Sequence, residues 1–173
     1  MSSMNYANIE YNSVVDGDGI RVSLFVSGCL NHCKGCFNPD TWDFGYGKPF
    51  TPIEENEIIE ASRPRYIAGL SVLGGEPFEL SNQEALLPFI ERYTRELPGK
   101  SLWMYTGYVL EKDLTPGGRR FVPDVTPKIL SAVDVLVDGP FVLEKRDLTL
   151  RFRGSSNQRV LSRADIARIL EGK

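Results

Sequence analysis

The chain has little of two residue types that often carry chemistry: its 173 residues include one histidine, His32, and only three cysteines. A single histidine excludes metal sites that need paired histidines, and any histidine-based triad would depend on this one residue. Basic charge is not in excess either. The net charge of −3 gives no general attraction to nucleic acid or to anionic membranes.

Long apolar runs are missing as well. None approaches the ~20 residues needed to span a bilayer. The first residues have neither the basic nor the apolar region of a secretory signal. An odd number of closely spaced cysteines, without export, indicates reduced thiols. We therefore expect a cytoplasmic protein with no nucleic-acid partner and no membrane partner.

The remaining composition is that of an ordinary globular protein, with 42% hydrophobic and 25% charged residues. The length suits one domain, residues 1–173, with a substantial core. No internal repeat or long linker divides the chain.

Strand-like and helix-like segments alternate along this domain. Apolar, β-branched and aromatic runs predict buried strands at Val22–Ser27, Tyr66–Leu73, Leu102–Thr106 and Ala132–Val137. Capping patterns predict helix starts at Thr51 with Glu54, at Ser81 with Glu84 and at Ser162 with Asp165. Such alternation is typical of βαβ units. We expect an α/β fold with a mostly parallel sheet and outer helices, either open and doubly wound or an incomplete barrel.

Glycine-bearing or polar loops follow the predicted strands. They are the cysteine loop, Gly74-Gly75-Glu76-Pro77, Thr106-Gly107-Tyr108 and Asp138-Gly139. Because ligands gather at the carboxyl ends of parallel strands, we expect these loops to meet at one edge of the sheet.

All three cysteines lie in one short loop, Cys29-Leu-Asn-His-Cys33-Lys-Gly-Cys36, with the spacing C-x3-C-x2-C. Thiolates suit iron–sulfur clusters and zinc alike. With His32 they are also the donors of a Cys3His zinc site, although structural zinc sites usually draw on two separated pairs of ligands. Three inert buried cysteines are disfavoured, because the loop is polar. For His32 itself we favour an ordinary loop position over a catalytic role.

C-x3-C-x2-C directly after the first predicted strand resembles the signature of the radical S-adenosylmethionine superfamily. The resemblance implies a single-domain incomplete (β/α) barrel in which Cys29, Cys33 and Cys36 hold a 4Fe-4S cluster. It further implies that the iron without a protein ligand binds S-adenosylmethionine, whose reductive cleavage gives a 5′-deoxyadenosyl radical. In such enzymes the cofactor supplies the chemistry and the protein orients it.

The segment Gly74-Gly75-Glu76-Pro77 resembles the GGEP segment of the same superfamily, which holds the methionine amino group of S-adenosylmethionine. Glycines Gly74 and Gly75 would let the backbone approach a ligand closely, and the Glu76 carboxylate complements an ammonium. An ordinary turn is the alternative. Asp138 is a further candidate cofactor contact, with a capping or turn role as the equal alternative.

The loop departs from the superfamily pattern beside its third cysteine. Many members have an aromatic residue immediately before it, whereas this chain has Gly35 before Cys36 and Phe37 after it. We therefore expect adenine contacts from the backbone around Gly35, Cys36 and Phe37. The Phe37 ring would either form a hydrophobic wall for the adenine or simply pack in the core.

Within the superfamily, the chain resembles the glycyl-radical activating enzymes, and more narrowly those that act on anaerobic ribonucleoside-triphosphate reductases. The segments that carry this resemblance are Asp16–Arg21, Phe25–Cys29, Cys36–Trp42, Tyr105–Tyr108, Val137–Gly139 and Arg153–Arg159. It implies hydrogen abstraction from a backbone glycine of the reductase, which is then a protein substrate, and a flavodoxin-like electron donor.

Other functions remain open at this point. A related enzyme could act on another glycyl-radical protein or on a small molecule such as a deazapurine precursor. A zinc-stabilised interaction domain is the non-enzymatic alternative. A nucleotide-binding protein is the weakest one, because the glycine-containing loops match neither G-x-G-x-x-G nor the Walker A pattern.

Overall fold

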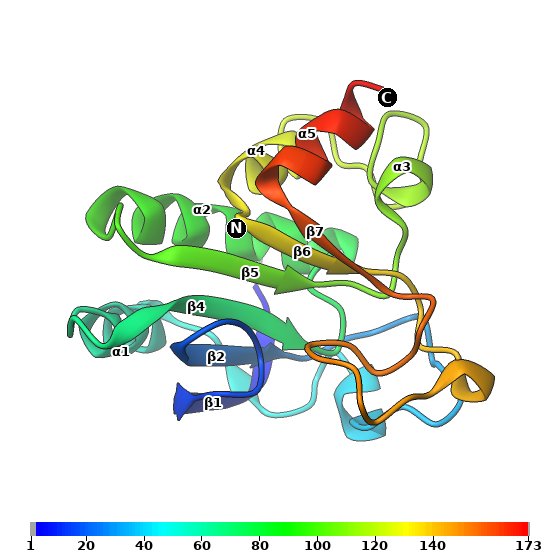
Figure 1. Ribbon diagram of the computed structural model, residues 1–173. Coiled ribbons are helices and arrows are strands. Elements are labelled where there is room, and N and C mark those ends of the chain that lie inside the picture. Colours follow the sequence, from blue (N-terminus) through cyan, green and yellow to red (C-terminus); the bar gives the residue numbers. More distant parts are fainter. Residues whose placement is uncertain (1–2, 173) are drawn as a thin grey trace.

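The computed structural model describes residues 3–172 and contains one seven-stranded sheet (Figure 1). Its strands are β1 (Asn5–Ser13), β2 (Ile20–Val26), β3 (Lys48–Pro49), β4 (Ile67–Gly74), β5 (Ser101–Tyr105), β6 (Val135–Asp138) and β7 (Arg159–Ser162). In space they follow the order β3-β1-β2-β4-β5-β6-β7. The central strands β2, β4, β5 and β6 are parallel, as predicted. The outer strands β1, β3 and β7 are antiparallel, so the sheet is mixed.

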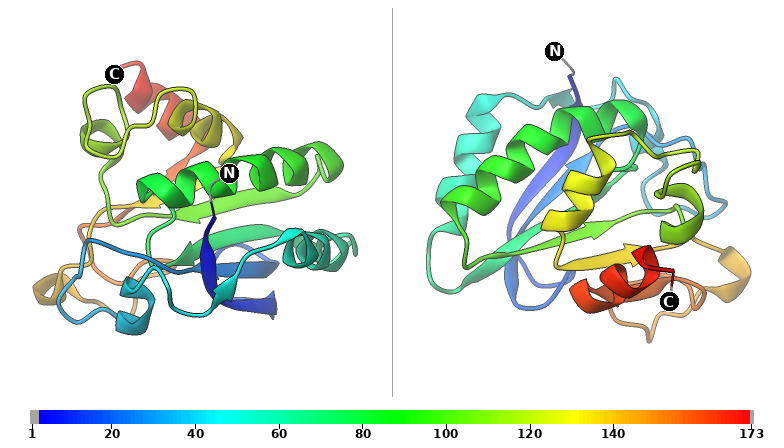
Figure 2. Two further views of the ribbon diagram at one scale, coloured as in Figure 1. Left: turned by 180° about the vertical axis from the view of Figure 1, so that it is seen from behind. Right: turned by 90° about the horizontal axis from the view of Figure 1, so that it is seen from above.

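Helices pack against one face of this sheet (Figure 2). They are α1 (Pro52–Ser62), α2 (Leu80–Glu96), α3 (Leu110–Asp113), α4 (Thr126–Ala132) and α5 (Arg163–Leu170), with 3-10 turns η1 (Pro39–Trp42) and η2 (Leu143–Lys145). The α/β prediction with outer helices is therefore confirmed. None of the helices within residues 3–172 is long and apolar enough to cross a membrane.

Two of the predicted helix caps are present and one is wrong. Thr51 and Ser162 each form a complete capping box, which places the starts of α1 and α5 where the sequence predicted them. Helix α2 instead begins at Leu80 with Glu79 in the capping position, so Ser81 lies inside the first turn. The Glu79 side chain makes no cap bond, because its carboxylate binds other groups.

Alternation along the strands separates an apolar face from a more polar one. Residues that join the core beneath the helices are Val22, Leu24, Val26, Leu70, Val72, Leu102, Met104 and Leu136. The residues between them face the other side of the sheet. Among these, Arg21 is fully buried, and its guanidinium donates to Ser71 Oγ at 2.8 Å and to Ser101 Oγ at 2.9 Å. Ser71 Oγ donates in turn to the Asp16 carbonyl, which ties the β1–β2 turn to this face.

Candidate functional site

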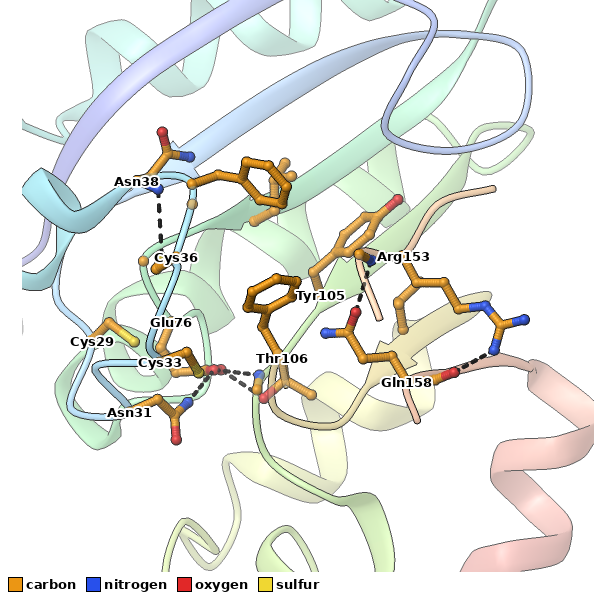
Figure 3. A pocket seen from close by; sticks show the side chains of 18 of the residues that line it. Cys29, Asn31, Cys33, Cys36, Asn38, Glu76, Tyr105, Thr106, Arg153 and Gln158 are labelled. Carbon is orange, nitrogen blue, oxygen red and sulfur yellow. Dashed lines mark hydrogen bonds between the residues drawn. The ribbon is translucent and has the colours of Figure 1, made fainter. Parts of the chain in front are cut away.

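A cavity of about 460 Å³ lies at the carboxyl ends of the parallel strands (Figure 3). Its lining includes Cys29, Cys33, Cys36, Gly74, Gly75, Glu76, Tyr105, Thr106, Gly107 and Val137. Residues 141–158, which we call the strap, supply a further wall through side chains such as Phe141, Leu148 and Phe152. Three of the four loops predicted to meet at one edge of the sheet line this cavity. The fourth, Asp138-Gly139, adjoins them through a hydrogen bond from Gly139 N–H to the Tyr108 carbonyl at 2.9 Å.

Backbone hydrogen bonds fix the path of the cysteine loop. Beyond β2 the chain turns back on η1, where Gly28 N–H donates to the Thr41 carbonyl at 2.7 Å and Cys29 N–H to the Trp42 carbonyl at 3.2 Å. Cys29 is consequently buried, whereas Cys33 and Cys36 are partly exposed. Cys36 N–H closes a turn onto the Cys33 carbonyl at 3.1 Å. The three thiols thus line one cavity from a short loop that is tied down at its start.

Burial favours the protonated form of the Cys29 and Cys33 thiols by raising the pKa of each. It raises the pKa of the Cys29 thiol to about 12, and the nearby Glu76 carboxylate adds to the effect. Burial also raises the pKa of Cys33. Thiols in this state are poor nucleophiles, whereas a bound metal displaces the proton from a coordinating thiol. The chemistry of the donor set therefore suits metal binding better than nucleophilic catalysis.

The three thiols of this loop supply the donors that an iron–sulfur cluster needs, because each cysteine of a cluster binds a different iron. Within residues 3–172, no three or more histidine, cysteine or carboxylate side chains gather closely enough to hold one metal ion. The His32 ring stacks on Trp42, with ring centroids 4.4 Å apart, as expected for a loop residue.

The Glu76 carboxylate joins three loops of the cavity. Oε2 accepts hydrogen bonds from Thr106 Oγ1 at 2.7 Å and Phe78 N–H at 2.9 Å. Oε1 accepts from Gly107 N–H at 2.6 Å and Asn31 Nδ2 at 3.3 Å. These bonds fill the four acceptor positions of a carboxylate, and the bond from Asn31 is the longest. Burial raises the pKa of Glu76 to about 7 although the hydrogen bonds oppose it.

Gly74 and Gly75 bring the end of β4 against the backbone of the cysteine segment. A Cβ on Gly74 would lie 2.6 Å from Val26 N, and one on Gly75 would lie 2.7 Å from the Gly28 carbonyl oxygen. Gly75 and Glu76 N–H groups donate to the Val26 and Gly28 carbonyls, both at 2.8 Å. The sequence predicted glycines for close approach of a ligand. In the structure, the atoms that fill the missing Cβ positions belong to the protein backbone.

Substituting Gly74 by alanine is expected to lower the free energy of unfolding of the metal-free protein by about 2–4 kcal/mol. Gly74 has φ +114°, which side chains rarely tolerate, and the new Cβ would overlap backbone atoms. Urea denaturation monitored by circular dichroism measures the change. Gly99→Ala is the matched control, because a Cβ there meets nothing within 4 Å. Equal midpoints for the two variants would contradict the prediction.

Of the predicted cofactor-binding residues, Gly35 and Asp138 do not line the cavity. Gly35 has φ +79°, and a Cβ there would lie 2.9 Å from Leu143 Cδ1, so it admits the strap close to the loop. Asp138 is buried and accepts hydrogen bonds from Leu110 N–H at 2.8 Å and from Arg159 at 2.6 Å. It anchors the end of β6 to α3 and β7. Phe37 does line the cavity and lies beside Phe141 of the strap.

The Arg153–Arg159 segment receives a structural role that its sequence did not reveal. Gln158 Oε1 accepts from Gly154 N–H at 2.9 Å and Ser155 N–H at 3.1 Å, and its Nε2 donates to the Gly139 carbonyl at 3.0 Å. Arg153 Nη1 donates to the Gln158 carbonyl. These bonds hold the strap beside the cavity, as Figure 3 shows.

Two polar groups of cavity-lining residues have no hydrogen-bond partner. They are Trp42 Nε1 and the Tyr105 hydroxyl, both buried. Buried polar groups without a partner are rare in folded proteins.

Comparisons with known proteins agree with this site. The family described as "4Fe-4S single cluster domain" matches residues 15–161. A protein of Haemophilus influenzae named "Anaerobic ribonucleoside-triphosphate reductase-activating protein" is 41% identical over 157 residues, covering 90% of this chain and 96% of the relative. Proteins with the same name from Escherichia coli K12 and from Enterobacteria phage T4 are 38% and 36% identical, and each is covered over 96% of its length. This chain therefore belongs to the family of anaerobic ribonucleoside-triphosphate reductase-activating proteins and carries its 4Fe-4S domain.

Proposed function

We propose that this protein is a radical S-adenosylmethionine enzyme of the cytoplasm that activates an anaerobic ribonucleoside-triphosphate reductase. One domain, residues 1–173, would hold a 4Fe-4S cluster at Cys29, Cys33 and Cys36. When bound, the cluster would supply one electron, received from a flavodoxin-like donor, for cleavage of S-adenosylmethionine into methionine and a 5′-deoxyadenosyl radical. That radical takes a hydrogen atom from a reductase glycine, giving 5′-deoxyadenosine and a glycyl radical.

The observation that carries this proposal is the shared cavity of the three thiols and the Glu76 carboxylate. An ammonium group beside the cysteines is complemented by this carboxylate, and the long bond from Asn31 is the one most easily replaced. Thr106 and Gly107 hold the carboxylate in place through short bonds. These residues would orient the cofactor.

Apolar side chains at the cavity support a protein as the substrate. Val15, Phe37 and Leu148 line the cavity and remain 66%, 67% and 78% exposed. They come from the β1–β2 turn, the cysteine loop and the strap. The order of the strands leaves β3 and β7 at opposite ends, which agrees with an incomplete barrel of the radical S-adenosylmethionine type. An open barrel of this kind admits a protein segment.

The test is anaerobic incubation of the reconstituted protein with reductant, S-adenosylmethionine and the reductase. A glycyl-type electron paramagnetic resonance signal on the reductase, with formation of 5′-deoxyadenosine, is expected. Metal analysis should give about four irons per chain. One zinc per chain would contradict the proposal. Turnover of a small molecule without a glycyl-radical signal on the reductase would contradict it too.

Leu148→Ser is expected to raise the reductase concentration needed for half-maximal activation about tenfold. Burying a leucine side chain at an interface contributes roughly 1.5–3 kcal/mol, and 1.4 kcal/mol corresponds to tenfold in affinity. Cleavage of S-adenosylmethionine without reductase should not change. Ile53→Ser is the matched control, because Ile53 is 65% exposed but lies in α1. The same effect in both variants would argue against contact at the strap.

A further inference from the structure

Glu79 is a buried carboxylate that accepts a hydrogen bond from the backbone of the cysteine loop. Only 2% of the residue is exposed, and its Oε2 accepts a hydrogen bond from Leu30 N–H at 2.5 Å. Leu30 directly follows Cys29, so this bond fixes the backbone immediately after the first cysteine. Glu79 does not line the cavity and therefore has no place among the cofactor contacts described above.

The charge of Glu79 is balanced by Arg120. Arg120 Nε donates to Glu79 Oε1 at 2.7 Å, and the two side chains are only 15% and 2% exposed. Tyr108 contacts both side chains, since its hydroxyl donates to the carboxylate at 2.9 Å and the Arg120 guanidinium lies 4.8 Å from its ring centroid. A buried carboxylate without a partner is costly, so Arg120 is the counter-charge that permits it.

We propose that Glu79 is a positioning residue for the cysteine loop and that Arg120 balances its charge, so that loss of either partner shifts the reduction potential of the cluster. This inference rests on the proposed function, because it requires a cluster at Cys29. A cluster gains one negative charge when it is reduced, and charges act strongly at short range inside a protein. With both partners present, the buried pair is neutral. Removing Arg120 leaves an unbalanced negative charge next to the cysteine loop, and removing Glu79 leaves an unbalanced positive charge there.

The experiment uses the full chain, reconstituted anaerobically, as Glu79→Gln, Arg120→Gln and the double variant. Potentiometric titration followed by visible absorption and electron paramagnetic resonance gives the midpoint potential. Glu79→Gln leaves Arg120 unbalanced and is expected to raise the potential, whereas Arg120→Gln leaves Glu79 unbalanced and is expected to lower it. Each should change the ratio of reduced to oxidised cluster about tenfold at a fixed potential, or ~59 mV. The double variant should return towards the wild-type value.

Arg119→Gln is the matched control. Arg119 also lies over the Tyr108 ring, at 4.9 Å, but it pairs with Asp113 and should leave the potential unchanged. If Glu79→Gln folds by circular dichroism but loads less iron, the positioning role is supported and Arg120→Gln carries the test of the potential. Shifts in the same direction in both single variants, or no shift at wild-type iron content, overturn the inference. A wild-type protein that binds no cluster defeats the proposed function instead.

Discussion

Replacing Cys33 by alanine is expected to remove the cluster and with it all glycyl-radical formation. The chain has three cysteines, and they supply every thiolate that a cluster could use. Removing one leaves two thiols for four irons, which is too few to hold the cube. Iron and sulfide should fall from about four per chain to near zero, and the radical signal on the reductase should vanish.

His32→Asn is the control for this result. His32 lies next to Cys33 and has φ +45°, a conformation that asparagine also adopts. Because its ring stacks on Trp42, the variant should keep the cluster and the radical signal. Loss of metal in His32→Asn, with zinc in the wild type, would restore the Cys3His alternative. A normal radical yield with Cys33→Ala would sink the assignment of the cysteines.

Glu76→Gln is expected to weaken binding of S-adenosylmethionine about 10- to 100-fold, because a hydrogen bond between charged groups is worth ~1.5–3 kcal/mol. The glutamine NH2 group would also place a hydrogen-bond donor against groups that are all donors to the Glu76 carboxylate. Equilibrium binding of S-adenosylmethionine to the reconstituted protein measures the loss. Asp113→Asn is the matched control, since it removes a buried carboxylate that does not line the cavity.

The pH dependence of folding identifies the same carboxyl group. Its pKa is raised from 4.5 to about 7 in the folded protein, so between these values the folded state holds a proton that the unfolded state has lost. Stability from this group is therefore complete below pH 4.5 and is lost as the pH rises through about 7. Glu76→Gln should lack this dependence. If Glu76→Gln lowers the free energy of unfolding but leaves the affinity for S-adenosylmethionine unchanged, Glu76 has only a structural role.

The sequence predicted the central sheet well because its strands are apolar. The run Leu102–Thr106 differs from β5 by one residue at each end. Strand β1 was missed because Asn5–Ser13 is mostly polar and only Ser13 is buried. Strand β7 is only four residues long and equally lacks an apolar pattern. Antiparallel outer strands of this kind pair through their backbone, which leaves little trace in the side chains.

The cysteines and the Gly74–Glu76 loop were predictable because their chemistry is local in sequence. The contacts that organise the site are not local. Asn31 meets Glu76 across 45 residues, and Leu30 meets Glu79 across 49. No rule based on the spacing of residues along the sequence predicts such pairs. The same holds for Gln158, whose role depends on where the strap folds back. Asp138 forms an ion pair with Arg159, and a polar residue at the end of a strand suits an ion pair as well as a ligand site.

The strap lies late in the sequence, so its wall of the cavity is synthesised after the cysteine loop. About 100 residues separate Cys36 from Phe141, where the strap begins. At roughly 5–20 residues per second, the ribosome needs about 5–20 s to synthesise that interval. During this time the three thiols have left the ribosome while one wall of their cavity does not yet exist. The newly made chain therefore has a window of seconds in which its cysteines are open to oxidants and to cluster donors alike.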